Sequence, residues 1–250
     1  MARRHFLVIG AQRSGTTFLH TLLEAHPDIV MARPTRPEPK VFLGEEVVAK
    51  GAEWYVATYF AHAAGEHVYG EKSTSYIEAP EAAGRARAVL GDIDVVALLR
   101  DPVERAVSNW RFSTDNGFET RSLEEALVEN LESSRPWDPS TTSVSPFSYL
   151  ERGRFSDYLG PWLETFPGRV HVRFLRDLLD DYRRIGDLYA VLGADSGFLP
   201  PEPTGRVNQS DTPRPRLSEE LEKRLREYFA DSDRALRELA GRDLPWPTLG

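Results

Sequence analysis

The stretch FLVIGAQRSGTT, residues Phe6 to Thr17, decides the fold of this chain. Its apolar start predicts a buried strand over residues 5–10, and Gly10 and Gly15 predict a tight turn. A helix is expected from Thr16 to about residue 25. A turn between a strand and a helix presents backbone N–H groups and the positive end of a helix dipole to an anion. The stretch therefore predicts an anion-binding loop.

The loop has the spacing of a nucleotide P-loop, G-x-x-x-x-G-K-[ST], but departs from it at one position. The lysine position holds Thr16, and the basic residue of the loop is Arg13. The hydroxyls of Ser14, Thr16 and Thr17 can add hydrogen bonds to a phosphate that the backbone holds. We expect a phosphate site without the lysine that serves a triphosphate. A plain strand-to-helix turn without a ligand is the alternative.

Composition limits the classes of protein to which the chain can belong. Its 250 residues, 40% of them hydrophobic, suffice for one large α/β domain, and we expect a single domain over residues 1–250. A formal net charge of -8 argues against a general nucleic-acid or anionic-membrane binder. The absence of cysteine excludes disulfides, thiolate nucleophiles and cysteine-based zinc sites. The apolar runs are too short for a signal peptide or a membrane span, so we expect a cytoplasmic protein.

Strand-like and helix-like segments alternate along the chain, which predicts a P-loop-like parallel β-sheet flanked by helices. Further strands are expected near residues 67–72, 94–100 and 169–174. Cap residues at Asp101, Ser122 and Ser218 predict the starts of three helices. Other helices are expected near residues 51–63, 80–90, 154–166 and 176–192, and residues 31–44, with three prolines, as a loop or extended segment.

A second candidate anion site follows the strand at residues 94–100. Arg100 lies at the carboxyl end of this strand, where open α/β sheets bind ligands, and Ser108 lies about two turns into the next helix. Both can reach one anionic group if that helix packs back toward the strand end. Two alternatives remain: Asp101 as a Mg²⁺ ligand, or Asp101 as a helix cap with no ligand nearby. The arginine just before Asp101 and the missing P-loop lysine speak against Mg²⁺.

Two further segments carry candidate catalytic groups. Glu38 stands between two prolines, which restrict its backbone, and it could serve as a general base beside the phosphate loop. An exposed proline-rich loop is the alternative. Lys72 at a strand end could face the same ligand, or it could be an ordinary charge on an edge strand.

Taken together and in this order, the four segments resemble the sulfotransferases that use 3′-phosphoadenosine 5′-phosphosulfate (PAPS). The likeness is to the branch that contains heparan sulfate sulfotransferases and their small bacterial relatives. GAQRSGTT (10–17) is similar to that family's 5′-phosphosulfate loop, and LLRDPVERAVSNW (98–110) to its 3′-phosphate motif. PEPKVF (37–42) is similar to its base segment, and GEKSTSY (70–76) to its Glu-Lys-Thr segment. The likeness continues to residues 241–246, so it covers nearly the whole chain.

The resemblance implies in-line transfer of a sulfuryl group from PAPS to a hydroxyl of a small-molecule or carbohydrate-containing acceptor. The product would be PAP, adenosine 3′,5′-bisphosphate, and no metal would be required. Glu38 would be the general base, and Lys72 together with Lys40 would stabilise the sulfuryl oxygens. An amine acceptor, a P-loop small-molecule kinase and a non-catalytic nucleotide binder are the alternatives.

The resemblance also implies how the donor is bound. Arg13 would contact the 5′-phosphate and the bridging oxygen, while Gly15, Thr16 and Thr17 would cradle that phosphate. Arg100 and Ser108 would hold the 3′-phosphate. Family members often close over this phosphate with a Lys-Gly-Arg-type loop before the last helix. Here the region carries Arg206 and Arg214 instead, and either could substitute.

Overall fold

The apolar runs of the sequence form a parallel β-sheet. In this computed structural model, which describes residues 3–133, 147–202 and 210–249, β1 (Arg4–Gly10) pairs with β3 (Val68–Lys72) and β4 (Asp94–Leu99). The short β2 (Ile29–Met31) extends the sheet beyond β3, and β5 (Val170–Phe174) extends it beyond β4. The strand order is β2-β3-β1-β4-β5, with every pair parallel. Every residue of β4 is buried, as expected of a central parallel strand.

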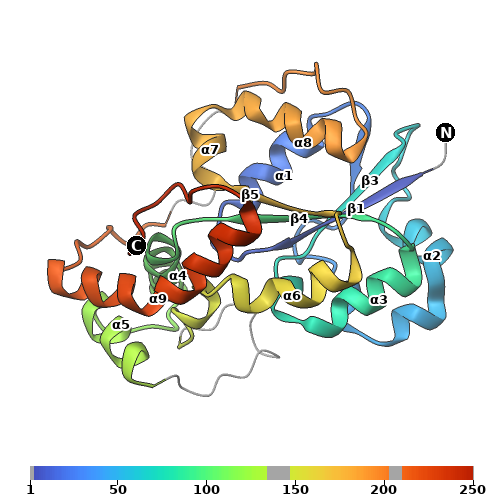
Figure 1. Cartoon of the computed structure of the whole chain (residues 1–250). Helices are drawn as coiled ribbons and strands as arrows, with labels where there is room; N and C mark the ends of the chain where they lie inside the picture. The colour runs from blue at the N-terminus through green and yellow to red at the C-terminus, as the bar shows by residue number, and fades with distance from the viewer. Residues whose placement is uncertain (1–2, 134–146, 203–209, 250) are drawn as a thin grey trace. The chain divides into compact units, whose positions relative to one another are not determined.

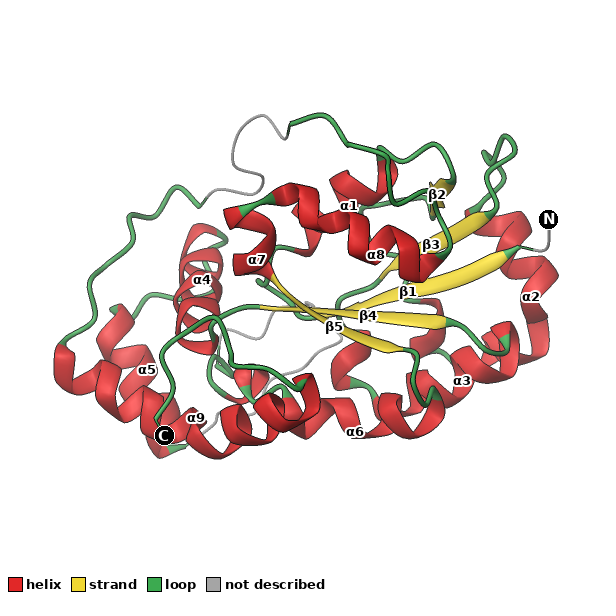
Figure 2. Ribbon diagram, turned by 45° about the horizontal axis from the view of Figure 1, so that its top comes forward, coloured by secondary structure: helices red, strands yellow, loops and turns green. Residues whose placement is uncertain are grey.

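The chain forms two compact units, residues 1–99 with 158–207 and residues 100–157 with 208–250. Helices cover both faces of the sheet in the first unit (Figures 1 and 2). One face carries α1 (Thr16–Glu24), α7 (Leu175–Asp180) and α8 (Ile185–Leu192). The other carries α3 (Pro80–Leu90) and α6 (Ser156–Thr165), and α2 (Glu46–Tyr59) packs against α3. This arrangement confirms the predicted α/β fold; a single domain over residues 1–250 stays a prediction.

The second unit is built on α4 (Pro102–Asp115), α5 (Leu123–Glu132) and α9 (Glu219–Ala240). Their apolar faces share one core, which includes Trp110, Leu127 and Phe229. The three predicted helix starts are confirmed. The Asp101 carboxylate accepts the N–H of Val103, residues 122 and 125 form a capping box, and the hydroxyl before α9 accepts a first-turn N–H.

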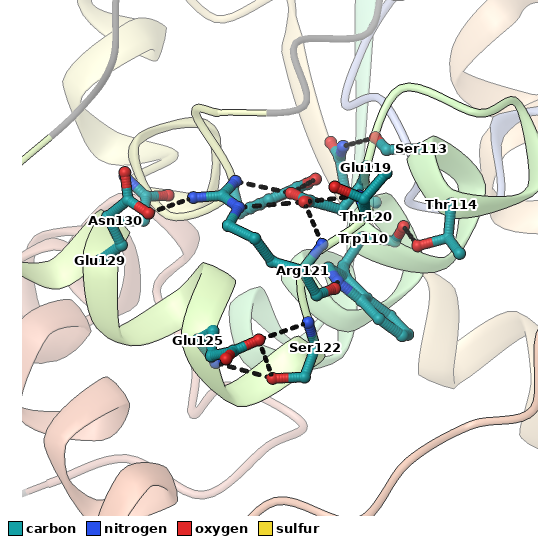
Figure 3. A network of polar contacts seen from close by, with 12 residues as sticks. Trp110, Ser113, Thr114, Glu119, Thr120, Arg121, Ser122, Glu125, Glu129 and Asn130 are labelled. Atoms are coloured by element: carbon teal, nitrogen blue, oxygen red, sulfur yellow. Dashed lines mark hydrogen bonds and ion pairs between the residues drawn. The ribbon is translucent and has the colours of Figure 1, made fainter.

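A buried carboxylate, Glu119, organises the connection between α4 and α5 (Figure 3). It accepts the backbone N–H groups of Thr120 and Arg121, both at 2.9 Å, and the Tyr149 hydroxyl at 2.8 Å. The Arg121 guanidinium pairs with Glu119 at 2.6 Å and continues to Glu129 of α5 at 2.6 Å. Burial alone would raise the pKa of Glu119, but the hydrogen bonds from Arg121 outweigh it and hold this pKa below its usual range. The network fixes how the chain enters α5.

Three segments differ from the sequence expectation. The short β2 was missed because three residues carry no usable alternation. The second helix starts at Glu46 rather than near residue 51, and Gly51 interrupts it with a φ of 75°. The expected helix over residues 176–192 is two helices separated by a 3-10 turn at Tyr182–Arg184, because the Asp181 carboxylate accepts the N–H of Arg183 and caps a new start.

Among the described residues, no helix has both the length and the apolar composition needed to cross a bilayer. Within the same ranges, His, Asp and Glu side chains form no cluster of three suited to a metal ion.

Candidate active site

The loop between β1 and α1 has the backbone of an anion site. Arg13 and Gly15 both adopt left-handed φ angles, 63° and 84°, on either side of Ser14. The first bond within α1 runs from the N–H of Leu19 to the carbonyl of Gly15 at 3.1 Å. Helix geometry therefore provides no intrahelical acceptor for the N–H groups of Gly15 and Thr16. A non-glycine residue held at positive φ is costly, and such positions cluster at ligand-binding loops.

The environment of Ser14 indicates that this loop suits a phosphate. Ser14 is fully buried, and its hydroxyl oxygen has no hydrogen-bond partner among the described residues. An unpaired buried hydroxyl is unfavourable by about 1–3 kcal/mol, and a phosphate oxygen would remove that penalty. The N–H of Ser14 itself donates to the carbonyl of Ala11 at 3.2 Å, so it belongs to the turn rather than to the cradle. The loop residues thus fit an anionic group.

Glu38 is fixed by groups at the end of β3. Its Oε1 accepts a hydrogen bond from the Lys72 ammonium, and its Oε2 accepts the N–H and the hydroxyl of Thr74, both at 2.9 Å. The side chains of Glu38 and Lys72 are only 17% and 9% exposed. The proline-rich segment is therefore not a free surface loop at this point. A carboxylate held in one orientation can serve as a general base without further ordering.

A pocket of about 430 Å³ joins Lys72 to the first helix. It is lined by Thr17, His20, Lys72 and neighbouring residues of α1 and the 33–36 segment. Burial lowers the pKa of His20, Glu24 opposes that shift, and Lys72 adds to it, so the ring favours its neutral form. The pocket therefore brings together the end of the phosphate loop and the lysine that holds Glu38. Its lining includes Lys72 but not Lys40.

The second unit gathers two of the predicted 3′-phosphate ligands around one carboxylate. Arg100 donates to Glu104 of α4 at 2.9 Å, and Arg214 donates to the other oxygen of the same carboxylate. Ser108 follows Glu104 by four residues and so shares its helix face. Arg214, rather than Arg206, can therefore be placed beside Arg100; Arg206 lies outside the described residues.

Both oxygens of the Asp101 carboxylate accept hydrogen bonds from other groups of the protein. Both its oxygens accept hydrogen bonds from the Arg226 guanidinium at 2.8 Å, and one also accepts the N–H of Val103 at 2.9 Å. A carboxylate paired in this bidentate way is a helix cap and an ion-pair partner. This geometry favours the structural alternative for Asp101 over a Mg²⁺ ligand.

Sequence reasoning missed two groups of residues that support these sites. Arg111 of α4 donates to the carbonyls of Thr212 and Ser210, at 2.7 and 3.1 Å, and Asp115 accepts the N–H of Thr212 at 2.9 Å. These bonds tie the segment before Arg214 to α4. Their signal was the polar face of α4, which continues past Ser108 at helical spacing. The other group centres on buried Glu71. The likeness of residues 70–76 to a Glu-Lys-Thr segment includes this residue, but no sequence signal marked the hydroxyls that surround it.

Residues 3–183 of this chain match the protein family described as the sulfotransferase domain. The crystal structure of a sulfotransferase from Alicyclobacillus acidocaldarius aligns with a TM-score of 0.75 and 25% sequence identity, covering 98% of each chain.

Two curated relatives act on heparan sulfate according to their names. Mouse heparan sulfate glucosamine 3-O-sulfotransferase 3B1 is 26% identical over 262 residues, which cover 96% of this chain and 64% of the relative. Human bifunctional heparan sulfate N-deacetylase/N-sulfotransferase 3 is 30% identical over 171 residues, which cover 65% of this chain and 19% of the relative. The chain therefore spans less than two thirds of the length of these relatives.

Proposed function

Because the chain belongs to the sulfotransferase domain family, we propose that it transfers a sulfuryl group from PAPS to a hydroxyl, with Glu38 as general base. One observation carries this proposal. Thr17 of the phosphate loop and Lys72, the partner of Glu38, line the same pocket. The proposed donor loop and the lysine that holds the proposed base therefore face one space, which suits a direct transfer between two bound molecules.

The proposed roles follow from the positions of the side chains. PAPS, when bound, supplies the sulfuryl group and leaves as PAP. Glu38 takes the proton of the acceptor hydroxyl as the acceptor oxygen bonds to sulfur and the bond from sulfur to the phosphate oxygen breaks. Arg13 and the N–H groups at the start of α1 neutralise the charge that grows on that phosphate oxygen. Lys72, which donates to Glu38, would also stabilise the sulfuryl oxygens.

The acceptor is proposed to be a small molecule or a short sugar-containing compound. The pocket beside Lys72 has a volume of about 430 Å³, which is the size of a typical small-ligand site. Its rim carries Arg33 and Arg36, both exposed, and Glu24, so charges of both signs surround the opening. A hydroxyl placed in this pocket would lie beside Lys72 and the base that it holds.

Calorimetric titration with PAP, beside ADP with and without Mg²⁺, tests the donor class. We expect PAP to bind at micromolar or lower Kd without Mg²⁺, and ADP to bind at least about tenfold more weakly, a difference of about 1.4 kcal/mol. Turnover of PAPS with a panel of hydroxylated acceptors then tests the reaction. Preference for ADP with Mg²⁺ would overturn the proposal in favour of a kinase, although the pairing of Asp101 with Arg226 speaks against that class.

Replacing Arg100 by alanine tests the proposed 3′-phosphate contact. A charge-assisted hydrogen bond contributes about 1.5–3 kcal/mol, so we expect the Kd for PAP to rise about 10- to 100-fold. The affinity for adenosine 5′-phosphosulfate, which lacks the 3′-phosphate, should change less than about threefold. Arg234→Ala, which removes an exposed arginine from α9, is the matched control and should leave both affinities unchanged. Equal PAP affinity in Arg100→Ala and wild type would remove Arg100 from this role.

A further inference from the structure

A buried carboxylate lies beside the proposed base and takes no part in the reaction described above. Glu71 of β3 is fully buried and directly precedes Lys72 in the chain. Three hydroxyl groups donate to it: Tyr55 at 2.8 Å to one oxygen, and Ser73 at 2.7 Å and Tyr76 at 2.5 Å to the other. Burial raises the pKa of Glu71, while the three hydroxyl bonds act in the opposite direction because they favour the ionised form.

Two of these hydroxyls also accept hydrogen bonds from the backbone that follows Glu38. The Ser73 oxygen accepts the N–H of Lys40 at 2.9 Å, and the Tyr76 oxygen accepts the N–H of Phe42 at 3.1 Å. A hydroxyl has a single proton, so a hydroxyl that donates to Glu71 presents only lone pairs on its other side. The carboxylate therefore determines that both oxygens can accept the N–H groups of the base segment.

The side chain of Glu38 and the backbone that follows it are held by the same segment, residues 71–76. Glu38 is held by Lys72 and Thr74, and the backbone two and four residues later is held by Ser73 and Tyr76. Residues 38–42 thus dock on residues 71–76 through both the side chain of the base and the main chain behind it. Lys40 adopts a left-handed φ of 52° within this stretch, and such a conformation persists only when its surroundings hold it.

A carboxylate can accept hydrogen bonds at both ends, and its amide isostere cannot. A glutamine has nearly the same volume and avoids the unfavourable burial of a charge. Its NH₂ group, however, can only donate, so it could no longer accept from the hydroxyls that face it: Tyr55 in one amide orientation, Ser73 and Tyr76 in the other. A carboxylate is the side chain of this size that accepts at both ends, and Glu71 uses both ends.

We propose that Glu71 is a positioning residue for the sulfuryl transfer, which fixes the Glu38 segment by orienting the hydroxyls of Ser73 and Tyr76. This inference rests on the proposed function, because it needs Glu38 to act as the base. It assigns no contact with donor or acceptor to Glu71 itself. Tyr55 donates to the other oxygen of Glu71 and to no backbone group of residues 38–42 among its described contacts.

The test compares Tyr76→Phe with Tyr55→Phe. Each variant removes one buried hydroxyl that donates to Glu71, but only Tyr76 also accepts an N–H from the base segment. We expect Tyr76→Phe to lower kcat at least about tenfold, because small displacements of a reacting group have large kinetic effects, with the KM for PAPS within about threefold of wild type. Tyr55→Phe should keep both constants within about threefold. Ser73→Ala, which also removes a hydroxyl that accepts an N–H of the base segment, should follow Tyr76→Phe.

Two further measurements separate positioning from a loss of fold. Hydrogen exchange of the amides at residues 40–42 should become at least about tenfold faster in Tyr76→Phe and stay near wild type in Tyr55→Phe. In a Glu38→Gln background, Tyr76→Phe should lower kcat no further, since its effect acts through Glu38. Equal kinetic losses in the two tyrosine variants would overturn the inference, as would faster exchange with unchanged kcat.

The exchange measurement needs no turnover. A wild-type chain that transferred no sulfuryl group from PAPS would refute the proposed function and the catalytic part of this inference together. The exchange rates would still decide whether Glu71 and its hydroxyls fix residues 38–42. The failure of one proposal is therefore distinguishable from the failure of the other.

Discussion

Glu38→Gln is expected to lower kcat about 1,000-fold, within the range of about 10²–10⁴ that a general base contributes. The glutamine amide fills the same space but cannot take a proton. The Thr74 N–H and hydroxyl can still bond to its carbonyl oxygen, so the segment should stay in place. Steady-state kinetics with PAPS measures the effect, and the Kd for PAP should change less than about threefold because the base does not bind the donor's nucleotide.

Glu45→Gln provides the matched control for this substitution. Glu45 lies on the same stretch of chain, its side chain is 90% exposed, and it pairs with Arg85 at 3.3 Å. Exposed pairs of this kind contribute little, so its kcat should equal that of the wild type. If Glu38→Gln also turned over at the wild-type rate, the proton acceptor would have to be another group.

Asp101→Ala is expected to lower the free energy of unfolding by about 3–4 kcal/mol. Removing one partner of a buried ion pair costs about 3 kcal/mol or more, and losing a helix N-cap adds about 1 kcal/mol. The side chains of Asp101 and Arg226 are only 14% and 10% exposed, so solvent screens the pair weakly. Chemical denaturation measures the loss, which corresponds to a fall in Tm of about 10 °C for a chain of this size.

Asp231→Ala is the control for Asp101→Ala. It also breaks an Asp–Arg pair on a helix of the second unit, but the partners Asp231 and Arg234 are 81% and 60% exposed. Such a pair contributes at most about 1 kcal/mol, so the stability should hardly change. Similar losses in the two variants would show that the Asp101 pair is not the strong interaction inferred from its burial.

The local parts of the fold could be predicted because they depend on short-range rules. Alternation of strands and helices gave the parallel sheet, and the caps at Asp101, Ser122 and Ser218 gave three helix starts. The segments that were predicted wrongly have two different causes. The three-residue β2 exists because β3 offers it an edge, and the break near Asp181 depends on one side chain that competes with the helix for an N–H.

In the candidate site, too, some residues could be predicted from sequence spacing, whereas the contacts between them could not. Arg13, Thr16 and Arg100 could be selected because each stands at a strand end or a helix start, which sequence spacing marks. The pairing of Lys72 with Glu38 joins residues 34 positions apart, and no periodicity reports it. Glu71 lies in a segment that carries the family resemblance, but its contacts could not be predicted. They depend on which hydroxyls surround it, and these come from both α2 and the chain after β3.

The strand order β2-β3-β1-β4-β5 has a consequence for how such a protein can diversify. The segment after β2 carries Glu38, the end of β3 carries Lys72, and the end of β1 opens into the phosphate loop. Neighbouring strands are about 4.8 Å apart, so the ends of β2, β3 and β1 follow one another along one edge of the sheet. Residues 33–36, which line the pocket, can therefore vary to suit a new acceptor while Glu38, Lys72 and the loop after β1 stay unaltered. Inherited change in the segment before Glu38 would alter the choice of acceptor, and change at Glu38, Lys72 or the loop would abolish the proposed transfer.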